Sequence, residues 1–458
     1  MRALKRLVLS VGLIAAASMA VSSQTQPAGS VGAVVYEHAR VIAGDGSAPI
    51  EDAAFVVDRG RIAAIGKTGS VRTPARAARV DLTGKTVMPG LVNAHVHIGY
   101  EGYTSWKAEN YTNENILDHL EREAFYGVSA AMSVGGDPTD RALAFQREQR
   151  AGALRPAARA FFAPGVVPPG GGPDPILIRG TTSLKAVYEV TTDAEARAAV
   201  RTITGTGLKH LKIWVDDRRG TYPKMPPEVY NAVIAEAHEN KIMVHAHALS
   251  LADQKAVVRA GADVLVHTVA DARVDDELLA LLKEKKPYWT PVMGFGDRSP
   301  LCVADPFNEQ TLPAAAVDAV RQTCARPSPN AAAREGILKY NFPRMIAAGA
   351  RLVLGTDAGV LPRYSFGWAE HHEIERYGEM GVPAADALVA STKRPAELIG
   401  ISDLGTLAPG KSADFLVLDA NPLDNLRNLR RIAGVYLAGA KLDRDALLPR
   451  WKGAAASR

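Results

Sequence analysis

Cysteine is scarce in this sequence, since 458 residues contain only two, Cys302 and Cys324. Two sulfurs without a nearby histidine exclude a zinc–thiolate site, and they are too few for a small disulfide-stapled scaffold. In an oxidising compartment, two cysteines at this loop-like spacing predict one disulfide bond between them. Two buried free thiols are the alternative.

A strong excess of one charge is also missing, because the formal net charge is only +5 at pH 7. No block of Lys and Arg is dense enough for the footprint of a nucleic-acid-binding protein, so that class of partner is excluded. Contents of 47% hydrophobic and 22% charged residues are ordinary for a globular protein. The length fits one large domain with a smaller one.

The apolar run near the start of the chain is too short for a good membrane span. This stretch, "LVLSVGLIAAASMAV", follows the basic "MRALKR", an order typical of a secretory signal peptide. Small residues place the cleavage after Ala20 or Ser23, so residues 1–23 are predicted to be removed. A retained anchor is the alternative. We therefore expect a periplasmic or secreted protein without a membrane association after cleavage.

Short β segments separated by turns fill both ends of the chain, in residues 31–86 and 402–445. They predict a small β-sandwich domain made from residues 24–86 and 402–458. Between them, eight apolar strand-like runs alternate with helical stretches. Such alternation predicts a parallel sheet, and eight units predict a (β/α)8 TIM barrel over residues 87–401.

Histidines gather at the ends of the predicted barrel strands. Of eleven histidines, five lie there, and an aspartate ends the last strand: His95, His97, His245, His247, His267 and Asp357. Because residues i and i+2 of a strand share a face, the two histidines of "HVH" point the same way. Imidazole and carboxylate groups are ligands for zinc or a similar divalent ion.

A second metal ion would need a bridging anion, and Lys212 in "LKHLKIWV" is the candidate. A protonated lysine cannot bind a cation. A lysine that has reacted with CO2 becomes a carbamate, which can bridge two ions about 3.5–4 Å apart. Burial between apolar neighbours favours the neutral amine that this reaction requires.

Five segments in this order resemble the amidohydrolase superfamily, in its imidazolonepropionase-like branch with a carboxylated lysine. They are "VMPGLVNAHVHIGY", "HLKIWVDD", "VHAHALSLADQKAVVRAGADVLVHT", "LGTDAG" and "LGTLAPGKSADFLVLDANPLDN". This branch includes Xaa-Pro dipeptidases and ochratoxinase-like amidases. The resemblance covers about residues 31–445 and implies that His95, His97 and Asp357 bind one metal ion. It also implies that Lys212, as a carbamate, bridges this ion and a second metal ion.

For the second ion, the resemblance implies one histidine from the fifth strand together with His267. His247 is favoured because the branch tends to place twenty residues between these two ligands. His245 is then a residue one pleat below, or part of the substrate site. The metals are expected to be zinc.

Other side chains are candidates for substrate binding, each with a structural alternative. Arg363 could bind a substrate carboxylate, and Tyr222 could donate to the scissile carbonyl oxygen. His371 and His372 either reach the substrate or form surface contacts at the start of a helix. Tyr100 and Tyr103 are expected to serve packing.

These features predict a binuclear metal-dependent hydrolase that cleaves an amide-type C–N bond in a small molecule. Its nucleophile would be a metal-activated hydroxide, and Asp357 would act as the general base. Ester, lactone or carbamate hydrolysis at the same centre is the alternative. A deaminase is less favoured, because "HAHALSLADQ" lacks the glutamate that such enzymes need near the strand-5 histidine. A non-catalytic scaffold would have lost metal ligands. A homo-oligomer is possible.

Overall fold

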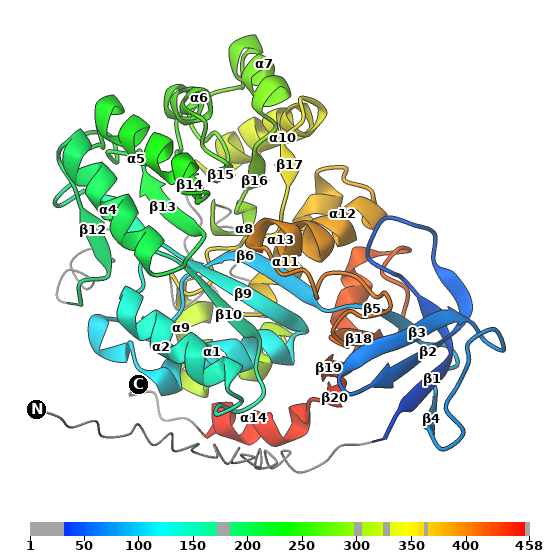
Figure 1. The fold of residues 1–458 in the computed structure, drawn as a ribbon. Helices are drawn as coiled ribbons and strands as arrows, with labels where there is room; N and C mark the ends of the chain where they lie inside the picture. Colours follow the sequence, from blue (N-terminus) through cyan, green and yellow to red (C-terminus); the bar gives the residue numbers. More distant parts are fainter. Residues whose placement is uncertain (1–31, 172–183, 297–304, 324–329, 361–364, 454–458) are drawn as a thin grey trace, which may run out of the picture.

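The computed structural model describes residues 32–171, 184–296, 305–323, 330–360 and 365–453. Within this part of the chain, strands and helices alternate over the middle and strands dominate both ends (Figure 1). Cys302, Cys324 and Arg363 lie outside the described residues. Of the helices described, none has the length and apolar character needed to cross a bilayer.

Both ends of the chain contribute to one eight-stranded sheet. Its order is β20-β19-β18-β5-β1-β2-β3, and β4 also pairs with β1. The strands are β1 (Val34–Val41), β2 (Ile50–Asp58), β3 (Arg61–Lys67), β4 (Ala78–Asp81), β5 (Thr86–Pro89), β18 (Phe415–Leu418), β19 (Ile432–Leu437) and β20 (Ala440–Lys441).

Aromatic residues hold the two ends of the chain together in this sheet. Tyr36 stacks on Phe55, with ring centroids 4.8 Å apart, and Phe415 stacks on Tyr436 at 4.2 Å. The edge of Tyr36 meets Phe415 at 5.3 Å. Because β5 pairs with β1 and β18, residues 87–89 belong to this sheet, although the sequence pattern assigned them to the first barrel strand.

Two parallel sheets form the middle of the molecule. One has the order β10-β9-β6, and the other β12-β11-β13-β14-β15-β16-β17. Their strands are β6 (Leu91–Val96), β9 (Val128–Val134), β10 (Arg159–Ala163), β11 (Gly165–Val167), β12 (Val187–Glu189), β13 (His210–Trp214), β14 (Met243–His247), β15 (Val264–Val266), β16 (Tyr288–Thr290) and β17 (Arg351–Leu352). A short hairpin, β7 (Glu101–Gly102) with β8 (Ser105–Trp106), follows β6.

Backbone contacts link the two parallel sheets at both sides. Only Pro164 separates β10 from β11, and its carbonyl accepts a hydrogen bond from Lys212 N–H at 2.8 Å. On the other side, Ala94 N–H donates to Leu354 O at 2.9 Å, and Val96 forms a parallel bridge with Ala358. This is a TIM-barrel-like α/β arrangement, which brings β6 next to the segment that follows β17.

Helices follow most of the parallel strands and cover them (Figure 1). They are α1 (Asn113–Phe125), α2 (Thr139–Arg150), α4 (Asp193–Gly205), α5 (Pro227–Glu239), α6 (Leu251–Ala260), α7 (Asp276–Lys285), α8 (Met293–Gly296), α9 (Ala314–Thr323), α10 (Ala331–Ala347), α11 (Trp368–Glu379), α12 (Ala384–Ser391), α13 (Lys393–Ile399) and α14 (Arg444–Lys452). Short 3-10 turns cover Ala108–Asn110, Asn308–Thr311 and Leu426–Arg430.

Local sequence signals explain where several of these helices begin and end. Thr192 and Glu195 form a capping box at the start of α4, and Pro227 occupies the first turn of α5. Gly261 ends α6 in the left-handed conformation that glycine adopts without strain. The bounds of these helices are therefore set by local sequence signals.

Candidate metal centre

Strand β6 delivers His95 and His97 to a carboxylate that follows β17. Both imidazoles are buried, and their Nε2 atoms lie 2.8 and 3.2 Å from Asp357 Oδ1. One ligand atom from each of these three residues fits within 4.8 Å of the others. The strand period of two puts the histidines on one face, and the link between β6 and residues 354–358 brings the aspartate to them.

The backbone at the centre adopts an uncommon conformation. Asp357 and His267 have φ angles of 58° and 74°, in the left-handed region that non-glycine residues rarely occupy. Each is held by a backbone hydrogen bond, from Asp357 N–H to His95 O at 3.0 Å and from His267 N–H to Thr290 O at 2.8 Å. Such local strain persists where the surrounding structure fixes it, and it is concentrated at functional sites.

The Lys212 side chain also reaches this centre. It is 1% exposed, and its Nζ lies 3.5 Å from His95 Nε2. The ammonium position is 5.1 Å from the ring centroid of Trp214. Strand β13 therefore points Lys212 toward the histidines of β6 and away from the helical shell.

Two more histidines lie beside this group. The rings of His247 and His267 are 4.4 Å apart between centroids, and His267 Nδ1 is 3.8 Å from Asp357 Oδ2. His95 and His267 are 6.2 Å apart. One buried cluster thus lies at the carboxyl ends of the parallel strands. It consists of His95, His97, Lys212, His247, His267 and Asp357.

His245 lies one pleat below this cluster. Its Nε2 is 3.1 Å from Nδ1 of His210, and the side chain is fully buried. Because β14 ends at His247, this residue lies nearer the carboxyl end of the strand than His245 does. His245 therefore contacts a neighbouring histidine and supports the cluster from inside the sheet.

Burial and neighbouring charges control protonation here. Burial, assisted by the charge of Lys212, lowers the pKa of His95 to about 3. Burial and then His247 hold the pKa of His267 well below its ordinary value. Burial opposes ionisation of Asp357, but His267 and His95 hold its pKa well below the usual range. At neutral pH His95 and His267 are therefore neutral imidazoles and Asp357 is an anionic carboxylate, the forms that bind metal ions.

This donor set fits divalent metal ions. Nitrogen and carboxylate oxygen atoms converge in one buried place, which suits zinc and similar ions. His95 Nδ1 and His97 Nδ1 are buried and form no hydrogen bond with any residue of the described segments. The site therefore has the donor chemistry for a metal ion at the three-residue group.

The sequence pattern did not single out Asp216, which follows β13. Its Oδ2 lies 3.1 Å from His247 Nε2, and the side chain is largely buried. The carboxylate can fix the orientation of the imidazole. Its position directly after the strand, in "WVDD", is the signal that could have identified it.

Asn93, Thr356 and Glu370 form a buried hydrogen-bonded group next to His95 and Asp357, which the sequence pattern did not indicate. Asn93 Oδ1 accepts from His95 N–H at 2.9 Å, and its amide donates to Thr356 Oγ1 at 2.9 Å and to Glu370. Thr356 Oγ1 also donates to Glu370 Oε1 at 3.0 Å. These buried residues connect α11 to the backbone on both sides of the centre.

His371 and His372 are not a surface pair, so that expectation was wrong. Both are buried in α11. His371 Nε2 donates to the carbonyl of Tyr126 at 2.8 Å, and His372 stacks on Trp368 with centroids 5.0 Å apart. A helix packed on all sides buries even its polar face, which the local sequence does not reveal.

The tyrosine candidates differ in burial. Tyr222 is half-buried, and its side chain forms no hydrogen bond with the described residues; its N–H donates to Asp217 O at 3.0 Å. Tyr100 and Tyr103 are buried, and their hydroxyls donate to Gly136 O at 2.5 Å and to Asp118 Oδ2 at 2.9 Å. These contacts agree with the packing role expected for Tyr100 and Tyr103.

Comparison with known proteins places the chain among hydrolases. The Amidohydrolase family matches residues 86–442. Ochratoxinase from Aspergillus niger is 24% identical over 424 residues, which cover 84% of this chain and 81% of that protein. Imidazolonepropionase from Deinococcus radiodurans is 27% identical over 425 residues, or 86% of this chain and 92% of the relative.

Solved structures share the fold. Molinate hydrolase aligns with a TM-score of 0.73 at 22% identity, covering 91% of this chain and 96% of its own. A Xaa-Pro dipeptidase with methionine in its active site aligns with a TM-score of 0.70 at 23% identity, covering 90% and 99%. Because the family match spans the parallel strands and the terminal sheet strands β18 and β19, this chain belongs to the amidohydrolase family and is a hydrolase acting on carbon–nitrogen bonds.

Proposed function

We propose that this protein is a binuclear metal-dependent amidase that cleaves the C–N bond of a dipeptide, an N-acyl amino acid or an aryl amide. The observation that carries the proposal is the convergence of His95, His97 and Asp357, with Lys212 Nζ 3.5 Å from His95. The resemblance to ochratoxinase and the fold shared with a Xaa-Pro dipeptidase and phenylurea hydrolase B support an amide-type substrate.

Each residue of the cluster has a role in this proposal. His95, His97 and Asp357 would hold one ion, and His247 and His267 the other. Lys212 would react with CO2 at Nζ, lose a proton and become a carbamate that bridges the pair. Two divalent ions, zinc in our proposal, would supply the Lewis acidity that activates water and polarises the scissile carbonyl.

Asp357 would also carry the proton transfer. Its carboxylate is anionic at neutral pH and lies within 3.8 Å of three imidazoles, so it is held in one orientation. It would accept the proton of the attacking water and pass it to the leaving amine. Burial of the cluster excludes bulk water and strengthens this electrostatic interaction.

The wider organisation of the protein follows the same proposal. We infer that the two parallel sheets close into one barrel that ends near residue 401, and that the terminal strands, with residues 87–89, form a β-sandwich. Residues 1–23 would be a signal peptide that directs the enzyme to the periplasm or outside the cell. The partner would be a small-molecule substrate, and a homo-oligomer is compatible with this organisation.

Metal content provides the direct test. Purified protein should contain about two zinc ions per chain, and Lys212→Ala should retain at most one. Loss of a Lewis acid should lower kcat by more than about a hundredfold. Lys209→Ala is the matched control, because Lys209 is an exposed residue just before the same strand.

Elemental analysis and turnover of N-acyl amino acids, dipeptides and aryl amides measure these effects. Unchanged metal content and turnover in Lys212→Ala would contradict the bridging role. Preferential turnover of lactones, esters or carbamates by the wild type would favour the alternative substrate class, since activated water attacks those carbonyls in the same way.

A further inference from the structure

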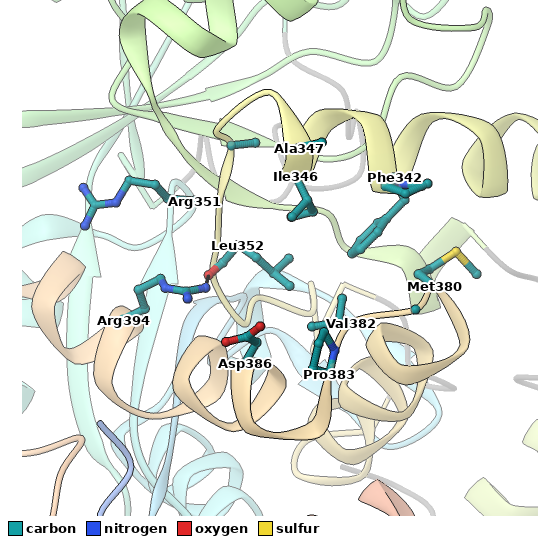
Figure 2. Close-up of a pocket in the computed structure, with 13 residues that line it drawn as sticks. Phe342, Ile346, Ala347, Arg351, Leu352, Met380, Val382, Pro383, Asp386 and Arg394 are labelled. Atoms are coloured by element: carbon teal, nitrogen blue, oxygen red, sulfur yellow. Dashed lines mark hydrogen bonds between the residues drawn. The ribbon is translucent and has the colours of Figure 1, made fainter. Parts of the chain in front are cut away.

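A cavity distinct from the metal centre, which we call the second cavity, lies at the opposite end of the parallel strands. It has a volume of about 480 Å³ and opens beside Arg351 of β17, which pairs with the first residue of β16, Tyr288. Asp357 instead follows the carboxyl end of β17. Figure 2 shows its walls, which come from α10, the α11–α12 connection, α12 and α13. This volume is within the range of small-molecule sites, about 300–1,000 Å³.

Most of the lining is apolar. Phe342 and Ile346 come from α10, Leu352 from β17, and Met380 and Val382 from the connection between α11 and α12. Phe342 is fully buried, while Ile346 and Val382 are half-buried. In Figure 2, Phe342 and Met380 lie on one side of the cavity, and the charged residues lie on the other. The cavity thus has an apolar end and a charged end.

Two guanidinium groups and one carboxylate form the charged end. Arg351 is held by Tyr288, since its NH2 donates to the phenol oxygen at 2.7 Å and its charge lies 3.8 Å above the ring. Arg394 NH1 donates to Leu352 O at 2.9 Å, which fixes the half-buried guanidinium. Asp386 is exposed and forms no hydrogen bond or ion pair with the described residues.

The charge of Arg394 is incompletely balanced. Burial is the main cause that lowers its pKa, and Arg351 lowers it further, whereas Asp386, Glu397 and Tyr288 act in the opposite sense. Neither arginine forms an ion pair with a carboxylate in the segments that the structure describes. A guanidinium has five N–H donors, and only one of those of Arg394 is used by the Leu352 carbonyl. Partly buried charge of this kind is stabilised by an anion that accepts the remaining donors.

We propose that this cavity binds a free α-amino acid with an apolar side chain. Arg394, with Arg351 beside it, would donate hydrogen bonds to the ligand carboxylate. Asp386 would accept hydrogen bonds from the ligand ammonium group, and the ligand side chain would lie against Phe342, Ile346 and Met380. The three chemical parts of such a ligand match the three parts of the lining, and the assignment is independent of the reaction at the metal centre.

Alternative ligands match the cavity less well. A simple carboxylate such as 3-phenylpropionate would leave Asp386 without a cation, and 2-phenylethylamine would leave the two guanidinium groups without an anion. A dianion would be repelled by Asp386. We therefore expect phenylalanine to bind more tightly than either single-charge analogue.

Isothermal titration of the metal-loaded protein with phenylalanine, 3-phenylpropionate and 2-phenylethylamine tests the proposal. Arg394→Gln should weaken phenylalanine binding by at least about tenfold, because charge-assisted hydrogen bonds are lost. Ile346→Trp should fill the cavity and abolish binding even if the fold is stabilised. Arg344→Gln is the matched control, since Arg344 is an exposed arginine of α10 that stacks on Tyr340 instead of lining the cavity.

Binding at the metal centre must be distinguished from binding here. Asp357→Asn should leave phenylalanine binding at the second cavity unchanged. The proposal is overturned if phenylalanine does not bind, if Arg394→Gln and Ile346→Trp bind it like the wild type, or if Asp357→Asn alone removes binding. Tighter binding of 2-phenylethylamine than of phenylalanine would also overturn it. Loss of amidase activity in the Lys212 test would leave this result unaffected.

Discussion

At the scale of single residues, the Asp216 carboxylate lies beside the imidazole of His247 in the candidate metal centre. Its Oδ2 is 3.1 Å from His247 Nε2, close enough to hold the imidazole in one orientation. Carboxylates that orient ligating histidines contribute about 10–100-fold to metal affinity or activity. This proximity arises from the pairing between β13 and β14; the position of Asp216 after β13, in "WVDD", is its only local signal.

If His247 and His267 hold a second metal ion as proposed, Asp216→Asn should weaken binding of that ion by about 10–100-fold, while the ion at His95, His97 and Asp357 remains bound. Metal titration with a competing chelator measures both affinities. Asp217→Asn is the control, because Asp217 is the adjacent, half-exposed residue. Equal loss of both ions, or no loss, would show that Asp216 does not act through His247.

A second single residue, Glu373, should make the stability of the fold depend on pH. It is buried in α11, where it accepts hydrogen bonds from the backbone N–H groups of Met293 at 2.9 Å and Gly294 at 2.8 Å. Burial, as the main cause, raises its pKa from 4.5 to about 7. The folded protein therefore binds this proton more tightly than the unfolded chain does.

The protonated Glu373 stabilises the folded state fully at pH values below the pKa of this carboxyl in the unfolded chain. This contribution is lost as the pH rises through the pKa of Glu373 in the folded protein. Relative to Glu373→Gln, the wild type should lose about 3 kcal/mol between about pH 4.5 and about pH 7. Thermal melting of both proteins across this range measures the difference. A constant difference in Tm would contradict the raised pKa.

At the scale of elements, helix α11 supports the metal centre from outside the sheet. Its Glu370 accepts from Asn93 and Thr356, which flank His95 and Asp357. Glu123 of α1 lies against it, and burial raises the pKa of both carboxyls, with Glu370 raising that of Glu123 further. Two buried carboxyl groups side by side hold a proton more tightly than an isolated carboxyl group does, because ionisation of one opposes ionisation of the other.

We expect Glu370→Leu to destabilise the fold by about 1–3 kcal/mol, because Asn93 and Thr356 lose a buried acceptor. It should also weaken metal binding at the His95–Asp357 side by about tenfold or more. Glu370→Gln keeps an acceptor oxygen and should remain close to the wild type. Thermal unfolding and metal titration measure the two effects, and normal metal affinity in Glu370→Leu would refute the supporting role.

At the scale of the whole molecule, helix α14, near the end of the chain, packs against α1. Trp451 is fully buried, its indole N–H donates to Asp118 Oδ1 at 3.0 Å, and its ring lies 5.3 Å from Phe125. Figure 1 shows α14 leaving the terminal sheet after β20 and passing beneath the helices of the parallel strands. The helix therefore fastens the sheet that carries both chain ends to the rest of the protein.

Removal of this contact should lower stability without changing the chemistry. Trp451→Ala should cost about 3–5 kcal/mol, as large buried aromatic residues do, and lower Tm by several degrees. Trp451→Phe retains most of the packing and should cost about 1–3 kcal/mol for the lost hydrogen bond. Differential scanning calorimetry measures this order, and kcat of the folded protein should stay unchanged. An unaltered Tm in Trp451→Ala would contradict the fastening role.

The sequence alone determined the strand-end placement of His95, His97, His247, His267 and Asp357, because strand periodicity and helix–strand alternation are local properties. The preference for His247 over His245 as a metal ligand came from the spacing that the family resemblance implies, and it stays a prediction. Only the tertiary structure decided which carboxylates lie next to these residues. Asp216 contacts His247 because β13 pairs with β14, and Glu370 contacts Asn93 and Thr356 because α11 packs against the sheet. The same holds for His371 and His372, because burial depends on neighbours far along the chain, and for the cavity at Arg394, whose walls come from four separate segments.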